Sequence, residues 1–117
     1  MLTIVFIIIF LATVILIAVA FFYVSSIIAT PPNGRAIDLA EQERPKIGRV
    51  VACIGDSLTH GNIGVCWVES LRQEFPKDIF LNEGINGDVV WQVHQRIKPI
   101  LKCKPDIVII MIGSNDA

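Results

Sequence analysis

The sequence predicts an α/β fold: a doubly wound parallel sheet in three α/β/α layers, incomplete and preceded by one transmembrane helix. Three observations support this prediction. Short apolar runs alternate with amphipathic helical patterns from residue 48 onward, which is the order of strand–helix–strand units. A polar, glycine-containing cluster directly follows each of these runs. An uncharged apolar stretch precedes them all, from Leu2 to Ala29.

The stretch from Leu2 to Ala29 has the length and composition of a membrane span. It contains no charged side chain, and about 20 apolar residues are enough to cross a bilayer. Tyr23, near its end, suits the interface between lipid and water. We therefore expect a signal anchor over residues 1–29, bound to the lipid bilayer through residues 2–29, in a single-pass membrane protein.

Two alternatives to the anchor stay open. The small residues Ala18-Val19-Ala20 have the spacing of a signal-peptide cleavage site, although no Lys or Arg precedes the apolar run and the run continues past that site. A buried core helix is the other alternative. The Lys and Arg residues follow the stretch, so the positive-inside rule favours a cytoplasmic domain, but the side of the membrane is left undetermined.

A polar linker is expected over residues 30–47. Pro31 and Pro32 end the apolar helix, and Asn33-Gly34 favours a turn. The residues that follow are polar with isolated apolar side chains, which is typical of a stalk or a short helix. The globular part of the chain is then expected over residues 48–117.

Three apolar runs are predicted as parallel strands. Residues 49–54 and 107–112 have the pattern of strands buried on both faces, and residues 78–81 form a shorter one. In a doubly wound sheet the functional crevice lies beyond the carboxyl ends of the strands. If the first strand lies between the other two, which is the flavodoxin-like order, the clusters that follow the strands become neighbours.

Two helices are predicted between the strands. The first ends before Pro76; the second follows Asp88, a plausible N-cap, with a break expected near Pro99. Trp67 and Trp91 fall on these helices and are expected to be packing residues. The apolar stripes are Val65, Val68, Leu71 and Phe75 in the first helix and Val90, Val93, Ile97 and Leu101 in the second.

The composition of the chain argues against several classes of function. The 117 residues carry a formal net charge of −1, which does not suggest a nucleic-acid partner. The three cysteines, Cys53, Cys66 and Cys103, show no Cys-x-x-Cys spacing, which argues against a zinc knuckle or a redox pair. We interpret them as free thiols in structural positions.

The three polar clusters, residues 55–59, 82–87 and 113–116, together offer the groups that acyl transfer needs. Ser57 follows a strand and precedes a helical segment, whose N-terminus favours developing negative charge. A serine nucleophile needs a base to take its proton. The oxyanion needs donors already in place, and the candidates are the backbone N–H groups of Ser57 and Gly87 and the side-chain amide of Asn115.

These clusters resemble the sequence blocks of the SGNH hydrolases, also called GDSL esterases and lipases. Residues 55–59, Gly-Asp-Ser-Leu-Thr, match the first block, residues 82–88 look like the second, and residues 113–116 are similar to the Gly-x-Asn-Asp third block. The resemblance covers about residues 48–117. It implies Ser57 as the nucleophile and Gly87 and Asn115 in the oxyanion hole.

The resemblance also implies an activity. It is that of a serine esterase, lipase or acylhydrolase, which cleaves carboxylic esters of small molecules, lipids or carbohydrates through an acyl-enzyme. No cofactor and no metal are implied.

One element of the family pattern, the Asp-x-x-His block that supplies the base, has no match in the sequence. We therefore expect the chain to be the N-terminal portion of a longer polypeptide, to which the activity belongs, with a natural truncation as the alternative. The alternative function is a non-catalytic membrane-tethered binding module that keeps the crevice and lacks the base.

Several of these residues also have purely structural interpretations. Ser57 alone would suit a helix cap, but three clusters in order favour the nucleophile. His60 has no evident carboxylate to orient it, so a loop contact near the crevice is expected and not a role as base. Asp56 and Asp116 are expected to fix loops by accepting backbone N–H bonds, not to bind metal.

Overall fold

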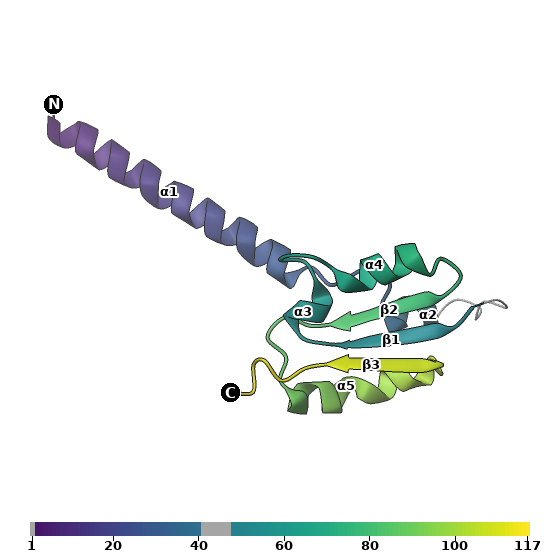
Figure 1. Cartoon of the computed structure of the whole chain (residues 1–117). Coiled ribbons are helices and arrows are strands. Elements are labelled where there is room, and N and C mark those ends of the chain that lie inside the picture. Colours follow the sequence, from purple (N-terminus) through teal and green to yellow (C-terminus); the bar gives the residue numbers. More distant parts are fainter. Residues whose placement is uncertain (1, 41–47) are drawn as a thin grey trace. The chain divides into compact units, whose positions relative to one another are not determined.

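A computed structural model of the chain describes residues 2–40 and 48–117. Contacts divide the chain into two compact units, Met1–Thr30 and Pro31–Ala117 (Figure 1). One part of the predicted linker, residues 41–47, lies outside the described residues.

The first unit is a single helix, α1 (Leu2–Ala29), of 28 residues. None of its residues is buried, and at about 1.5 Å per residue its length exceeds the hydrocarbon thickness of a bilayer. Two of its hydroxyl groups donate to carbonyls of the preceding turn, Thr13 Oγ1 to Ile9 at 2.9 Å and Ser26 Oγ to Tyr23 at 2.7 Å. The helix is therefore long and apolar enough to cross a membrane, a property that a signal sequence shares.

The second unit confirms the predicted fold class. Three parallel strands, β1 (Val50–Gly55), β2 (Ile79–Gly84) and β3 (Ile107–Met111), pair in the order β2-β1-β3. The first strand thus lies in the middle, which is the flavodoxin-like order. All three strands end at one edge, since Gly55 pairs with both Gly84 and Met111.

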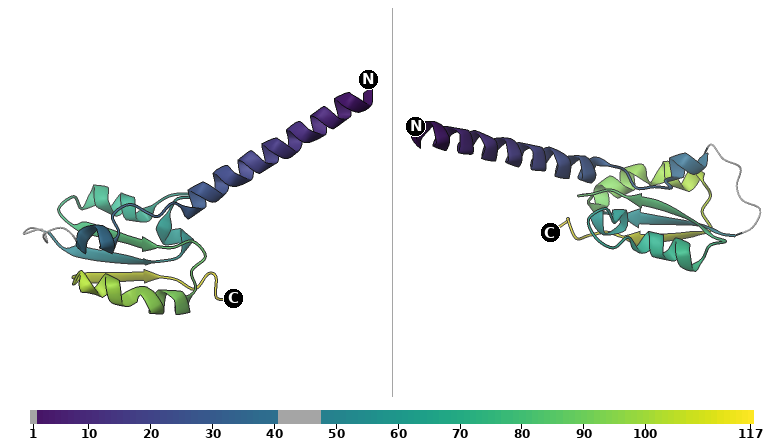
Figure 2. Two further views of the ribbon diagram at one scale, coloured as in Figure 1. Left: turned by 180° about the vertical axis from the view of Figure 1, so that it is seen from behind. Right: turned by 90° about the horizontal axis from the view of Figure 1, so that it is seen from above.

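Helices cover both faces of the sheet, so the unit has three layers (Figures 1 and 2). Helix α4 (Trp67–Glu74) packs on one face, and α2 (Ala36–Ala40) and α5 (Val90–Lys102) pack on the other. Alternate side chains of β1 point to opposite faces, as the period of a strand requires. The buried cluster beside α2 and α5 is Ala36, Val50, Ala52, Ile54, Leu81, Val93 and Ile100; the one beside α4 is Val51, Cys53, Val68 and Phe80.

Two strands differ from the prediction. Strand β2 continues through Gly84, so the start of the second cluster lies inside the strand, where Asn82 and Glu83 pair with Cys53 and Ile54 of β1. Strand β3 was expected to be buried on both faces, and this is wrong: all five of its residues are exposed, by 36% to 53%. It forms an edge of the three-stranded sheet, so within the described residues it has a partner strand on one side only.

The helical stripes are only partly correct. In the first helix, Val68 is buried, whereas Val65 precedes the helix and is 85% exposed. In α5 the buried face is centred on Val93 and Ile100, and the predicted stripe residues at its two ends are exposed. Trp91 was expected to be a packing residue; it is 64% exposed and stacks on His94.

The predicted cap and break of α5 are also wrong. Val89, and not Asp88, is the N-cap residue, and its backbone N–H donates to Gln92 Oε1 at 3.0 Å. The carboxylate of Asp88 points to an arginine of the same helix instead. Pro99 lies inside the helix without ending it. Pro99 and Gln95, whose carbonyl loses its helical donor, are both exposed, so water can solvate that carbonyl.

The segment after α1 joins the second unit well before residue 48. Asn82 N–H donates to the carbonyl of Gly34 at 3.0 Å, and Arg72 donates to that of Asn33 at 2.9 Å. Ala36 is buried in the core beside α5. The described residues between 33 and 40 are therefore packed as part of the domain.

Candidate active site at the carboxyl edge of the sheet

The first cluster forms a one-turn helix, α3 (Ser57–His60), directly after β1. Asp56 is its N-cap: the carboxylate accepts from Leu58 N–H at 3.0 Å, and the residue is 1% exposed. Gly61 ends the turn in the left-handed conformation, with φ +75°. Ser57 is half-buried at the start of this turn.

Two glycines allow this turn to lie directly on the sheet. A Cβ at Gly55 would collide with Thr59 and with the carbonyl of Met111, and a Cβ at Gly84 would collide with the backbone of His60. Asn82 adds a hydrogen bond from its side-chain amide to the His60 carbonyl, at 3.2 Å. The position of Ser57 is thus set by the close approach of α3 to the ends of the strands.

The second cluster leaves β2 and turns back toward β1. Ile85 N–H donates to the carbonyl of Gly55 at 3.1 Å, and Asp88 N–H donates to the carbonyl of Ile85 at 3.2 Å. Gly87 lies between them, exposed, with φ +78°. A side chain there would be strained by the backbone, and a Cβ would meet no protein atom within 4 Å. The side of Gly87 on which a Cβ would project therefore faces open space.

The third cluster is tied to both of the others. Ser114 Oγ donates to Asp56 Oδ2 at 2.5 Å, and Asn115 Nδ2 donates to the carbonyl of Asp88 at 3.0 Å. Asp116 accepts from Val90 N–H, the first residue of α5, at 3.1 and 3.2 Å. Asp56 and Asp116 thus accept backbone N–H bonds, as expected from the sequence.

These contacts bring the three clusters together at one edge of the sheet. Asn115 uses one amide N–H to hold Asp88, which leaves its second N–H for another acceptor. Ser57 lies at the start of α3, Gly87 and Asn115 lie in loops, and these three segments are joined pairwise by hydrogen bonds. No Cys, His, Asp or Glu group of metal-site size occurs among the described residues.

His60 ends α3 and is only 6% exposed. Within the described part of the chain its Nδ1 has no hydrogen-bond partner, so no carboxylate orients the ring there. Its backbone carbonyl accepts from the side-chain amide of Asn82 in β2.

A network of charged side chains near the carboxyl edge of the sheet was not predicted from the sequence. Arg96 on α5 contacts Glu83 of β2 and Asp88, which directly follows the second cluster, and both carboxylates are nearly inaccessible. The signal was present in the sequence, because Arg96 interrupts the apolar stripe of α5 between Val93 and Ile100. A charged residue on a core-facing stripe indicates a buried partner.

Two of the three cysteines, Cys53 and Cys103, lie away from the three clusters, whereas the Cys66 thiol contacts the His60 carbonyl and the Asn82 side chain. Cys53 is fully buried in β1, and burial raises the pKa of its thiol to about 11. Burial, followed by the nearby Glu83 carboxylate, raises the pKa of Cys103. Both thiols therefore stay protonated at neutral pH, as poor nucleophiles.

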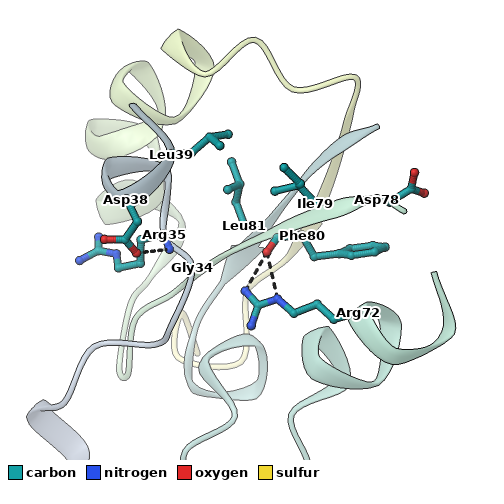
Figure 3. Close-up of a pocket in the computed structure, with 9 residues that line it drawn as sticks. All are labelled: Gly34, Arg35, Asp38, Leu39, Arg72, Asp78, Ile79, Phe80 and Leu81. Carbon is teal, nitrogen blue, oxygen red and sulfur yellow. Dashed lines mark hydrogen bonds between the residues drawn. The ribbon is translucent and has the colours of Figure 1, made fainter. Parts of the chain in front are cut away.

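A cavity of about 300 Å³ lies elsewhere, along the outer edge of β2 (Figure 3). Arg72 crosses it and donates to the carbonyl of Phe80 at 2.7 and 3.2 Å. None of its lining residues belongs to the three clusters. They are Gly34, Arg35, Asp38, Leu39, Arg72, Asp78, Ile79, Phe80 and Leu81.

Among solved structures, the chain is similar to an acetyl xylan esterase from Geobacillus stearothermophilus, Axe2. A tryptophan-to-isoleucine variant is 31% identical with a TM-score of 0.49, over 62% of this chain and 43% of that one. Axe2 itself is 32% identical with a TM-score of 0.48, over 62% and 42%. The chain thus spans less than half of these structures. No curated protein matches it.

The model of the GDSL-like lipase/acylhydrolase family matches residues 53–117, which is more than half of the 117 residues. The match begins in β1 and takes in all three clusters. The chain therefore belongs to the GDSL-like lipase/acylhydrolase family.

Proposed function

We propose that the complete protein is a serine hydrolase that cleaves carboxylic esters through an acyl-enzyme. The observation that carries this proposal is the pairwise hydrogen bonding of the three clusters, Asp56 to Ser114, Asn115 to Asp88 and Ile85 to Gly55, at one edge of the sheet. Family membership supports the reaction type. The substrate is an ester of a small molecule, a lipid or a carbohydrate.

In the first half-reaction Ser57 Oγ attacks the carbonyl carbon of the ester while a base takes the hydroxyl proton. The carbonyl oxygen becomes an oxyanion, which accepts from the backbone N–H groups of Ser57 and Gly87 and from the free N–H of Asn115. The carbon–oxygen bond to the alcohol then breaks, and the alcohol leaves with the proton. A water molecule attacks the acyl-enzyme in the same way and releases the carboxylic acid and Ser57.

The base belongs to an Asp-x-x-His block of the family pattern, which residues 1–117 do not contain. His60 is not proposed for this role, because it is buried at the end of α3 and no described carboxylate orients it. Asp56 accepts from Leu58 and from Ser114, so we assign it to holding the loops and not to proton transfer.

The test uses the complete protein with a short-chain nitrophenyl ester and a fluorophosphonate probe. Ser57→Ala is expected to abolish labelling and to lower kcat at least about a thousandfold. Asn115→Ala, which removes one oxyanion donor, is expected to lower kcat about a hundredfold to a thousandfold. Ser70→Ala is the control, since Ser70 is an exposed serine whose Oγ contacts the carbonyl of Cys66.

If Ser57→Ala hydrolyses the ester as fast as the unaltered protein, the assignment of the nucleophile is wrong. If the unaltered protein neither hydrolyses esters nor reacts with the probe, while ligands still bind at the carboxyl edge, the protein is the binding module that the sequence left as the alternative.

We further propose that α1 is a signal anchor and holds the protein in a lipid bilayer. Its 28 residues are apolar and none is buried. The protein is expected to stay in the membrane fraction after extraction at alkaline pH, with its N-terminal residues intact. Release of the protein together with a new N-terminus near Ala20 would identify a cleaved signal peptide instead.

A further inference from the structure

Arg96 is a charged residue on the core-facing side of α5, and its guanidinium joins the ends of two strands to the second cluster. Its Nε donates to Asp88 Oδ2 at 2.7 Å and one terminal nitrogen donates to the carbonyl of Gly55 at 3.1 Å. The other terminal nitrogen lies 3.7 Å from Glu83 Oε2. We propose that Arg96 is a positioning residue that fixes the oxyanion donors, an inference that rests on the proposed function.

The contacts of Arg96 end beside the groups assigned to the reaction. Gly55 is two residues before Ser57, and its carbonyl also accepts from Ile85 N–H. Asp88 directly follows Gly87, so holding its carboxylate restrains the peptide that presents the Gly87 N–H. One guanidinium thus links the loop of the nucleophile to the loop of the backbone donor.

Asp88 extends this restraint to the third donor. While its carboxylate binds Arg96, its backbone carbonyl accepts from Asn115 Nδ2 at 3.0 Å. The position of the Asn115 amide therefore depends on Asp88, and Asp88 depends on Arg96. Because a displacement of about 1 Å at a reacting centre can cost on the order of a hundredfold in rate, this dependence is expected to appear in kcat.

Burial and charge explain why an arginine is needed here. Side chains of Glu83 and Asp88 are only 3% and 7% exposed, so neither charge is well solvated. Glu83 has further partners in Arg35, at 3.4 Å, and in the backbone N–H of Ala36, but Asp88 has Arg96 as its charged partner. The planar guanidinium donates to the Asp88 carboxylate and the Gly55 carbonyl at once, while its remaining terminal nitrogen lies near Glu83 without a hydrogen bond. A lysine ammonium on its single stem cannot reproduce this arrangement.

The test compares Arg96→Lys with the unaltered complete protein. We expect kcat to fall about tenfold to a hundredfold, with KM changed by no more than about threefold, because the substrate still binds while the donors are misplaced. The rate of labelling by the fluorophosphonate should fall in parallel. Arg96→Ala is expected to regain part of its activity when millimolar methylguanidinium is added.

Arg49→Lys is the matched control. Arg49 also binds an aspartate through Nε and a terminal nitrogen, Asp78 at 3.1 and 2.6 Å, but it precedes β1 at the opposite end of the sheet. Its kcat should equal that of the unaltered protein. Asp88→Asn is the second variant, for use if Arg96→Lys does not fold, and it should lower kcat without a comparable change in KM.

A folded Arg96→Lys protein that keeps kcat within twofold overturns the proposal, as does a loss of thermal stability with unchanged kcat, which would make Arg96 a purely structural residue. Failure of the proposed function has a different signature, because it is seen as full activity in Ser57→Ala. The Arg96 comparison is therefore made only on activity that Ser57→Ala abolishes.

Discussion

At the scale of single residues, the carboxyl edge of the sheet is a layer of buried polar groups above an apolar core. The buried polar residues of the described chain all belong to or flank the first two clusters: Asp56, Thr59, His60, Asn82, Glu83 and Asp88. Burying an ionised carboxylate is costly unless it is paired and hydrogen-bonded. Glu83 and Asp88 are paired with arginines, and Asp56 accepts hydrogen bonds from Leu58 N–H and the Ser114 hydroxyl. The layer is therefore built to hold loops in one arrangement.

The buried thiol of Cys53 yields a prediction at this scale. Because burial raises its pKa to about 11, Cys53 stays protonated and unreactive in the folded protein. At pH 8 a disulfide reagent is expected to modify Cys66 and Cys103, which are half-buried, and to reach Cys53 only after urea is added. Thiol counting with and without urea measures this. Equal rates for all three cysteines without urea would contradict it.

The raised pKa of Cys53 also makes the free energy of unfolding depend on pH, in a direction that can be predicted. The unfolded thiol ionises near pH 8.5 and the folded one near the raised pKa, about 11. Between these values the unfolded state has lost a proton that the folded state keeps, so the free energy of unfolding falls as pH rises. The Cys53→Ala variant is expected to show a smaller decline of the free energy of unfolding between about pH 8.5 and 11. An unchanged slope would argue against a contribution from Cys53.

At the scale of the elements, the sequence predicted the order of strands and helices because apolar periodicity is a local property. It predicted less well where each element ends or what covers it. Asn82 and Glu83 extend β2 because pairing with β1 overrides their low strand propensity. The exposure of β3 depends on which elements lie beside it, and a run of five apolar residues carries no information about its neighbours.

Some residues of the candidate site were likewise predicted from local sequence, and others were missed because they depend on distant contacts. Ser57, Gly87 and Asn115 were predicted because each lies in a short polar cluster that directly follows a strand. The network of Arg96, Glu83 and Asp88 was missed because its members are 5 to 13 positions apart and meet only in the folded sheet. Asp88 was assigned to a helix cap from its local position alone, whereas the distant Arg96 determines where its carboxylate points.

Helix α5 yields a prediction at the scale of elements, because its first N–H is capped by a residue from the third cluster. Asp116 accepts from Val90 N–H and places a negative charge at the helix N-terminus. Asp116→Ala is expected to lower the free energy of unfolding by about 1 kcal/mol. Asp116→Asn keeps an acceptor oxygen but removes the charge, so it should lower the free energy of unfolding by a smaller amount.

Urea denaturation of the complete protein measures both variants. The difference between them should shrink in 1 M salt, because salt screens a charge at an exposed helix end. A midpoint for Asp116→Ala equal to that of the unaltered protein would show that the contact does not stabilise α5.

At the scale of the whole molecule, the two compact units meet in sequence at residues 30 and 31, yet the second unit does not start with the family match at residue 53. Residues 33–36 provide acceptors to Arg72 and Asn82 and a donor to Glu83. Glu83 in turn contacts Arg96. The segment that follows α1 is thus connected through polar contacts to the site at the carboxyl edge.

This connection predicts how the protein responds to truncation. Deleting residues 1–30 from the complete protein removes α1 alone, and the free energy of unfolding of the domain should stay within about 0.5 kcal/mol of that of the detergent-solubilised protein. Deleting residues 1–47 also removes Gly34, which accepts from Asn82 N–H, and Arg35 and Ala36, which contact Glu83. Because a hydrogen bond to a charged group contributes about 1.5–3 kcal/mol, this second deletion should lower the free energy of unfolding by at least about 2 kcal/mol.

Urea denaturation of the two truncated proteins measures this difference in the free energy of unfolding. The Arg35→Ala substitution in the shorter deletion separates the contribution of the Arg35–Glu83 ion pair from that of the backbone contacts. Arg35 is one-third exposed and 3.4 Å from Glu83, so its loss alone should cost less than about 1 kcal/mol. The remaining difference between the deletions then includes the backbone hydrogen bonds at Asn33, Gly34 and Ala36 and the packing of Ala36 and Leu39 on the core. Equal midpoints for both deletions would show that this segment only links α1 to the domain.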